Sequence, residues 1–189
     1  MPESEPERVL RTARLIVRRA AEEDIPLYMQ LWNDPRVMGN VGFPQGLRTT
    51  PERVRGLIRQ GRDPFDSLLV AALAKTGMPV GECRLHPPDE TGIASTDVKL
   101  LPRHQSVGYG SELKRGLVGW LFENTDCRAV KGTPGVDNIA SIRMQESVGG
   151  VRVGKATYRF PGNMSVPTRP VEHYIYLVRR CDWETETKA

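Results

Sequence analysis

The residues between Leu100 and Ser111 have the types and the spacing to bind a phosphate-bearing ligand. An apolar stretch typical of a strand ends at Leu100-Leu101, and a turn carrying Gly108 and Gly110 leads directly into a long helical pattern. The N-terminus of such a helix presents unpaired N–H groups and a partial positive charge. Glycine lets the backbone approach a phosphate closely. The stretch predicts an anion cradle that fits a pyrophosphate, although an isolated junction of this kind is also compatible with an ordinary turn.

Two common nucleotide-binding motifs do not account for this stretch. A Walker A loop requires GxxxxGK[ST], which the sequence lacks. A dinucleotide fingerprint requires GxGxxG, but Leu113 stands where the third glycine would be. The acidic residues about 20 positions further on, Glu123 and Asp126, fall at the end of the helix and not after a second strand. We therefore set the nucleotide interpretations aside.

Hydrophobic periodicity predicts the elements that position this turn. Leu113, Leu117 and Leu121 recur at helical spacing after it, and Thr50-Pro51 is typical of a helix start. Residues 36–49 are expected to form a loop. The predicted helices run from about residue 25 to 34, from 50 onward, and over 108–123 and 138–148. The predicted strands are 14–19, 67–74, 80–85, 93–101, 127–131, 151–159 and 171–179.

This order of elements, β-α-α-β-β-β-α-β-α-β-β, predicts the α/β class: a mixed sheet with helices on both faces. The chain has 189 residues, which suits one domain and allows a core without disulfides or metal. We expect the domain to cover residues 12–183. Residues 1–11 are expected to form a flexible N-terminal tail and residues 184–189 a C-terminal tail.

Composition excludes several classes of protein. No apolar run approaches the length of about 18 residues that a membrane span needs, and the polar N-terminus does not resemble a secretory signal. The three cysteines and three histidines show no metal-ligand spacing, so no metal site is expected. The odd number of cysteines favours free thiols in a reducing, cytoplasmic compartment. The net charge is +4, and several arginines lie within residues 53–62. These arginines either form a solvated helix face or attract a polyanionic cofactor. A nucleic-acid contact is a third interpretation, which the absence of nucleic-acid motifs disfavours.

The turn itself resembles a known enzyme motif. Gln105-x-x-Gly108-x-Gly110, after a strand that ends in a proline, looks like the Q/RxxGxG/A motif of the GNAT superfamily of N-acetyltransferases.

Three further segments resemble the same superfamily. Residues 12–18 (TARLIVR), followed by Glu22-Glu23-Asp24, look like the opening of its ribosomal-protein N-terminal acetyltransferase branch. Asn138-x-x-Ser141-x-x-Met144 before Gly149 resembles the helix on the far side of the cofactor, and residues 174–183 resemble the last strand of that branch. Each motif is loose, but the ordered set spans about residues 12–183.

The resemblance implies a single GNAT-like domain whose mixed, mostly antiparallel sheet is splayed in the middle. The splay leaves a V-shaped gap for the pantetheine arm of acetyl-CoA. Backbone groups of Leu100 and Leu101 would pair with that arm, an N–H near Leu100 would polarise the acetyl carbonyl, and the N–H groups of 105–111 would hold the pyrophosphate. Arg103, Lys114 or Arg143 would meet the 3′-phosphate, unless each is an ordinary surface charge. The cofactor-binding residues expected from the resemblance are Leu100, Leu101, Gln105, Ser106, Val107, Gly108, Tyr109, Gly110, Ser111, Asn138 and Arg143.

The implied chemistry is direct attack of a neutral amine on the thioester. An α-amino group has a pKa of roughly 7.7–8.0 against about 10.4 for lysine, so an N-terminal amine needs little help from a base. Glu82 and Asp97 are the candidate bases, acting directly or through water, or else solvent-facing strand carboxylates. The family often places a tyrosine acid seven residues after the asparagine, where this chain has Gln145. Ser141 is the candidate replacement, unless it only packs against the cofactor.

The acceptor expected from the resemblance is a protein N-terminal amine or a small-molecule amine. The segment 36–62 is expected to form one wall of the acceptor site. The missing tyrosine leaves open the alternative of a catalytically weak acyl-CoA-binding module with the same fold. A homodimer is possible because an exposed sheet edge favours pairing of two copies.

Overall fold

Eight strands form one mixed sheet in the computed structural model, which describes residues 7–188. The strand order is β1-β2-β3-β4-β5-β6-β8-β7, and every neighbouring pair is antiparallel except β5 and β6. This confirms the predicted fold class. The strands are β1 (Arg8–Arg11), β2 (Leu15–Arg19), β3 (Leu69–Leu73), β4 (Pro79–His86), β5 (Ile93–Leu100), β6 (Ala129–Gly132), β7 (Val151–Tyr158) and β8 (Val171–Arg179).

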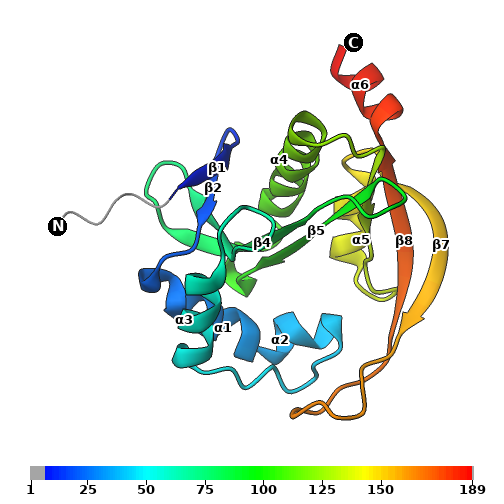
Figure 1. The fold of residues 1–189 in the computed structure, drawn as a ribbon. Coiled ribbons are helices and arrows are strands. Elements are labelled where there is room, and N and C mark those ends of the chain that lie inside the picture. Colours follow the sequence, from blue (N-terminus) through cyan, green and yellow to red (C-terminus); the bar gives the residue numbers. More distant parts are fainter. Residues whose placement is uncertain (1–6, 189) are drawn as a thin grey trace.

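Helices cover both faces of the sheet (Figure 1). One face carries α4, and the opposite face carries α1, α2 and α3. Leu113, Leu117 and Leu121 of α4 are fully buried, as the helical spacing predicts. The helices are α1 (Ile25–Asn33), α2 (Pro35–Met38), α3 (Pro51–Gln60), α4 (Tyr109–Asn124), α5 (Ile139–Glu146) and α6 (Arg180–Lys188).

The sheet separates two hydrophobic cores. Leu69 and Ala71 of β3 pack in the core under α4, whereas Val70 and Ala72 pack in the core under α1 and α3. Successive side chains of a strand point to opposite faces, so a strand that is covered on both faces must be apolar throughout. This explains the unbroken apolar run that predicted β3.

The sheet opens between β5 and β6. The two strands pair only over Ile93–Ser95 and Ala129–Lys131, and β5 then continues to Leu100 without β6 beside it. The other side of β5 stays paired with β4 from Ser95 to Leu100. The backbone of residues 96–100 therefore borders a gap on the β6 side, which is the splay that the resemblance implied.

Three short segments differ from the expectations. Residues 8–11, which were assigned to the N-terminal tail, form β1 and pair with β2, and residues 184–188 of the expected C-terminal tail belong to α6. The expected loop over 36–49 contains part of α2 and a 3-10 turn at Gly39–Val41. Asp34 makes α2 possible, because its side chain accepts the Arg36 N–H at the helix start. Residues 1–6 and 189 lie outside the described residues.

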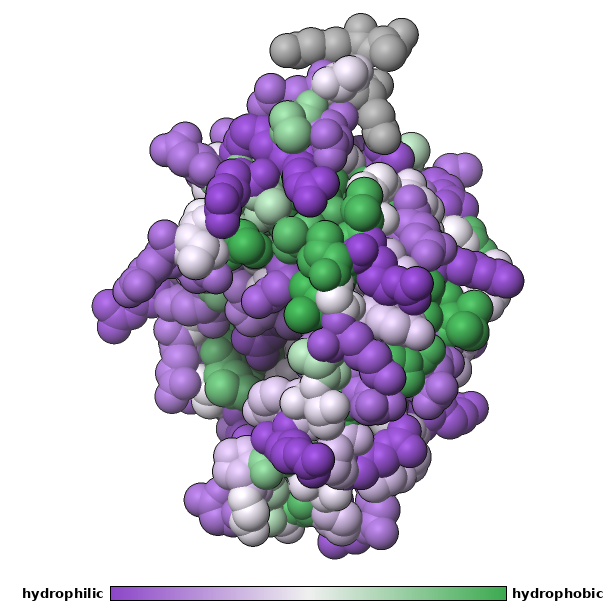
Figure 2. Space-filling view, turned by 90° about the vertical axis from the view of Figure 1, so that its right-hand side faces the viewer, coloured by the Kyte–Doolittle hydropathy of each residue, from purple (hydrophilic) through white to green (hydrophobic). Residues whose placement is uncertain are grey.

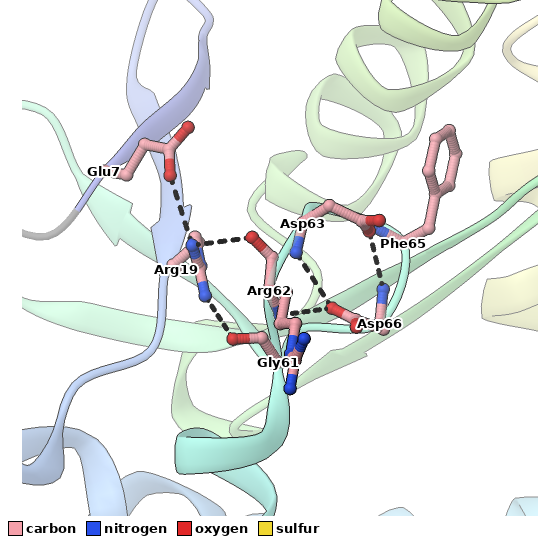
Figure 3. Close-up of polar contacts among 7 residues, drawn as sticks. All are labelled: Glu7, Arg19, Gly61, Arg62, Asp63, Phe65 and Asp66. Carbon is pink, nitrogen blue, oxygen red and sulfur yellow. Dashed lines mark hydrogen bonds and ion pairs between the residues drawn. The ribbon is translucent and has the colours of Figure 1, made fainter.

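Arg19 ties the end of α3 to β2 (Figure 3). Its guanidinium donates to the carbonyl oxygens of Gly61 and Arg62 and contacts Glu7 at 3.3 Å. The Asp66 carboxylate accepts the N–H groups of Arg62 and of the residue after it, which closes the turn after the helix. These contacts fix α3 against the sheet, where Arg53 and Leu57 of α3 line a cavity.

The β7 edge of the sheet is unusually exposed. Figure 2 looks onto the side of the molecule that carries β7 and β8, where apolar side chains lie among hydrophilic ones. Val151, Val153 and Tyr158 are each about half exposed. No helix within residues 7–188 is long and apolar enough to cross a membrane.

Candidate active site

A cleft of about 410 Å³ lies at the splay. One side is the end of β5 with the turn and first residues of α4, and the other is the first half of α5. The segment 37–41 closes part of its rim. The lining residues are Val37, Asn40, Val41, Val98, Lys99, Leu100, Gln105, Ser106, Gly108, Gly110, Ser111, Asn138, Ala140, Ser141, Arg143 and Met144.

The turn before α4 has the geometry of an anion cradle. Ser106 and Gly108 both have a positive φ, 63° and 85°, and Gly108 is the N-cap of α4. No side chain of the described residues caps this helix, so its first N–H groups are left for another acceptor. Left-handed residues beside helical ones form concavities of backbone N–H groups that bind anions. Both residues line the cleft, so an anion there would meet these groups.

Leu100 and Leu101, predicted together, have different roles. The Leu101 N–H donates to Val80 at 3.0 Å and its carbonyl accepts from His104, so both backbone groups have partners, and its side chain is buried under α1. The Leu101 N–H is therefore not free for a ligand, and a part for Leu101 in cofactor binding stays a prediction. Backbone directions alternate along an antiparallel ladder, so the N–H groups of Val98 and Leu100 point away from β4, toward the splay. Leu100 keeps its predicted place at the cleft.

Gln105 holds the turn to the end of β5. Its Nε2 donates to the Leu100 carbonyl at 2.9 Å, and the residue also lines the cleft. Val107 and Tyr109 do not line it. The Val107 carbonyl accepts from Arg14, whose guanidinium lies 4.7 Å from the centre of the Tyr109 ring. These two predicted cofactor residues therefore do not face the cleft with their side chains.

Glu112 is a residue of the turn that the sequence analysis did not single out. It lies in the first turn of α4 and accepts from the Thr12 hydroxyl, the Arg14 N–H and the Arg14 guanidinium, all within 2.7 Å. The T-x-R pattern at the start of the predicted domain thus anchors the cradle from 98 residues away in sequence. The signal was Glu in the first turn of a helix, where carboxylates are favoured, but no sequence pattern names its distant partners.

Two motif residues on α5 face the cleft, and Gln145 does not. Asn138 is the N-cap of α5, because its Oδ1 accepts the Ser141 N–H at 3.1 Å. Within the described residues the Ser141 hydroxyl makes no hydrogen bond, and it lines the cleft. Gln145 is buried and packs against Gly132 of β6, where a Cβ would meet its side chain. Gln145 is thus not placed to act in the cleft in place of the expected tyrosine.

The three candidates for binding the 3′-phosphate differ in whether they line the cleft. Arg143 lines the cleft. Arg103 contacts Gln30 and His104 and does not line it. The expectation that Lys114 meets the 3′-phosphate is wrong, because its side chain is fully buried and donates to the Thr96 hydroxyl at 2.7 Å. Burial lowers the pKa of Lys114 to about 8, against the opposing effect of Asp97.

A second cavity of about 350 Å³ lies on the α1 and α3 face of the sheet. Lys99 lines both cavities, so they meet at this residue. Five of the lining residues come from the segment 36–62 that was expected to form an acceptor wall. The lining residues are Trp32, Met38, Leu47, Thr49, Arg53, Leu57, Glu82, Arg84, His86, Asp97 and Lys99.

Glu82 lies on the floor of this second cavity and is buried, not solvent-facing. Its Oε1 accepts from Trp32 Nε1 at 2.7 Å and pairs with Lys99 Nζ at 3.0 Å. Its Oε2 is buried and has no hydrogen-bond partner within the described residues. An unpaired buried oxygen costs roughly 1–3 kcal/mol, and a ligand with an N–H group would relieve that cost.

Asp97, the other candidate base, is half exposed and paired with His86 at 2.9 Å. Burial raises the pKa of Asp97, but the hydrogen bond from His86 and the charges of Lys99 and Lys114 outweigh it, so the net direction is down. A carboxylate with a lowered pKa binds a proton weakly. Glu82 differs from Asp97 in its geometry, because its Oε2 is buried in the second cavity and has no hydrogen-bond partner within the described residues.

The sequence matches a family model for the acetyltransferase (GNAT) domain over residues 14–151. The chain belongs to the GNAT acetyltransferase family. No curated protein matches it. The ribosomal-protein branch suggested by the motifs is not specifically supported.

Solved structures of GNAT enzymes share its fold. An acetyltransferase of the GNAT family from Bacillus anthracis has a TM-score of 0.73 at 19% identity and covers 90% of this chain and 97% of its own. A spermidine N-acetyltransferase from Vibrio cholerae, in complex with CoA and spermine, has a TM-score of 0.74 at 16% identity, covering 90% and 98%. An aminoglycoside acetyltransferase with coenzyme A and kanamycin has a TM-score of 0.66 at 18% identity, covering 90% and 98%.

Several cleft residues that were not predicted from the sequence come from segments without a chemical signature. Val37, Asn40 and Val41 belong to the segment expected to be a plain loop, and Val98 is an ordinary strand valine. Only the path of the backbone places them at the cleft. Within residues 7–188 no group of three or more His, Cys, Asp or Glu residues could hold a metal ion.

Proposed function

We propose that this GNAT enzyme binds acetyl-CoA in the cleft at the splay and transfers its acetyl group to a primary amine held in the second cavity. The observation that carries the proposal is that the two cavities meet at Lys99, beside the splayed end of β5. A thioester in one cavity and an amine in the other would then come together. The CoA and the amines bound by the spermidine and aminoglycoside relatives support the same pairing.

Each residue has a proposed part in the transfer. The N–H groups of the α4 turn hold the pyrophosphate, and Arg143 meets the 3′-phosphate. The N–H of Val98 or Leu100, which points into the splay, stabilises the oxyanion that forms on the acetyl carbonyl. This fits the residues present, because no strand covers this side of β5.

Two protons must move during the reaction. The amine nitrogen attacks the carbonyl carbon, the carbon–sulfur bond breaks, and the thiolate leaves. The Glu82 carboxylate accepts the amine proton, directly or through water. The Ser141 hydroxyl donates a hydrogen bond to the departing thiolate, which then takes its proton from solvent water. The acceptor class follows from the resemblance, a protein N-terminal amine or a small-molecule amine.

Replacement of Ser141 tests the proposal. Ser141→Ala should lower kcat by about tenfold, the value of one lost hydrogen bond of roughly 1.4 kcal/mol, and leave the affinity for acetyl-CoA unchanged. Thiol release and acetylated product are measured together. Ser147→Ala, at the C-cap of α5, is the matched control, because the Ser147 hydroxyl donates to the Met144 carbonyl and the residue does not line the cleft. Equal kcat values for the two variants would remove Ser141 from the mechanism, and absence of any acetylated amine would refute the proposed function.

A further inference from the structure

The charges around the second cavity do not balance. Three cationic side chains line it, Arg53, Arg84 and Lys99, against the two carboxylates Glu82 and Asp97. The remaining titratable lining residue, His86, can only add positive charge. The other arginines of α3, Arg55 and Arg59, do not enter the count, because neither lines the cavity and both lie against Glu22. The cavity therefore carries a net positive charge.

The ion pairs show where that charge is available. Glu82 pairs with Lys99, and Asp97 pairs with His86. Within the described residues neither the Arg53 nor the Arg84 guanidinium makes an ion pair or a hydrogen bond. Two guanidinium groups without partners at one cavity favour an anion, and a carboxylate matches the fork of a guanidinium.

The floor of the same cavity offers a complementary acceptor. Glu82 Oε2 is buried and without a partner, so an amine N–H of a ligand could donate to it. Glu82 and Arg84 lie two residues apart on one face of β4, which places their Cα atoms roughly 7 Å apart. The ladder with β5 sets Glu82 opposite Lys99 and Arg84 opposite Asp97. Glu82 is thus at the end that meets the cofactor cleft, and Arg84 is farther from it.

We infer that the acceptor is a small aminocarboxylate, a primary amine with a carboxylate, held with its amine at Glu82 and its carboxylate at Arg84 and Arg53. This inference rests on the proposed function. The volume of about 350 Å³ lies at the lower end for small-molecule sites, which suits an amino acid or a dipeptide. A polyamine would add positive charge to a cavity that already has an excess.

The test measures binding separately from acetyl transfer. L-alanyl-L-alanine, its C-terminal amide and spermidine are titrated into the protein with CoA present. The dipeptide should bind at least about tenfold tighter than its amide, since a hydrogen bond to a charged group contributes about 1.5–3 kcal/mol. Arg84→Gln should reduce this ratio to less than about threefold. Lys75→Gln, which removes an exposed charge in the turn between β3 and β4, should leave the ratio unchanged.

The outcomes distinguish the inference from the proposed function. Equal or tighter binding of the amide or of spermidine, or no binding of the dipeptide, would overturn the inference. A ratio that Arg84→Gln does not reduce would also overturn it. The same samples are then given acetyl-CoA and analysed for acetylated product. Transfer without a preference for the carboxylate would refute the inference alone, whereas a binding preference without transfer to any amine would refute the proposed function.

Discussion

Glu82 shows how a single side chain can be fixed and yet remain available. One carboxylate oxygen is held by Trp32 and Lys99, which sets the orientation of the group. The other oxygen is buried without a partner, in a cavity that meets the cofactor cleft. Burial strengthens each electrostatic interaction because the local dielectric is low. The proposed function uses this free oxygen to accept the proton of the amine.

Glu82→Gln should lower kcat/KM by about 10²–10⁴-fold, the usual contribution of a general base. Asp97→Asn should change it less than about threefold, because Asp97 is half exposed and engaged by His86. Initial rates at pH 7 measure both effects, and the affinity for acetyl-CoA serves as the control for folding. A large loss in Asp97→Asn with little loss in Glu82→Gln would reverse the assignment.

Lys114 is a buried amine that affects the stability of the fold. Its amine is fully buried under β5, and its pKa is lowered to about 8, whereas an unfolded lysine has a value of about 10.4. Between these values the unfolded chain binds more protons than the folded one, so the stability of the folded chain rises with pH over this window. Below about pH 8 the folded protein bears the cost of a buried charge.

The Lys114→Met variant isolates this effect. At pH 7 the variant should be the more stable protein, and its advantage should shrink by on the order of 3 kcal/mol as the pH rises from about 8 to about 10.4. Denaturant unfolding of wild type and variant at a series of pH values measures the difference in their free energies of unfolding. Cys83 and Tyr28, whose pKa values are raised by burial, have the opposite pH dependence, but they are present in both proteins and so cancel in this difference. Exposed Lys75→Met is the control. A pH-independent difference between wild type and Lys114→Met would contradict this account.

Among the helices and strands, those marked by hydrophobic periodicity or by a capping residue were predicted from the sequence. Leu113, Leu117 and Leu121 indicated α4, and Thr50 caps α3 as expected. β1 was missed because its arginine-bearing sequence has no alternating pattern and is ordered by pairing with β2.

The candidate site was predicted in part, for similar reasons. Gly108, Gly110, Asn138 and Ser141 carry a local signature and line the cleft. The resemblance assigned Leu101 to the cofactor and offered Lys114 as one of three candidates for the 3′-phosphate, but whether a side chain faces the core or the cleft depends on distant elements. Glu112 could not be linked to Thr12 or Arg14, because no local pattern reports a contact about 100 residues away.

The turn between β1 and β2 contacts α4 through Thr12, Arg14 and Glu112, and this contact gives a testable prediction. Burial raises the pKa of Glu112, but the hydrogen bonds from Thr12 and Arg14 and the Arg14 charge outweigh it, so the net shift is downward. A lowered folded pKa adds stability above the unfolded value of about 4.3, and this stability is lost as the pH falls through the folded value. Glu112→Gln should therefore be less stable than wild type at pH 7, by about 1–2 kcal/mol.

The difference between wild type and Glu112→Gln should vanish in acid, below the folded pKa of Glu112. Thermal unfolding between pH 7 and pH 3 measures it. Glu123→Gln, at an exposed site on the same helix, should match wild type throughout. A Glu112→Gln difference that persists unchanged at pH 3 would show that packing, and not the charge, holds the cradle to the turn between β1 and β2.

At the scale of the whole molecule, one splayed sheet explains both cavities. The core under α4 supports the cradle from one face, and the core under α1 and α3 supports the second cavity from the other. Lys99 lines both cavities and lies on the part of β5 that has no β6 beside it, and the proposed function brings the two substrates together there. The homodimer expected from an exposed sheet edge remains a prediction, which sedimentation of the purified protein would test.

Calorimetric titration of acetyl-CoA into the protein tests the central claim most directly. Gly110 has room for a Cβ, at 3.4 Å from Met144 Sδ, so Gly110→Glu should keep the fold while placing a negative charge in the cradle. The control is Gly56→Glu on α3, which has open space around it and lies outside the cleft. The account predicts one acetyl-CoA per chain for wild type and control, and binding at least about 100-fold weaker for Gly110→Glu, as for two lost charge-assisted hydrogen bonds. Equal binding by all three proteins, or none by wild type, would contradict it.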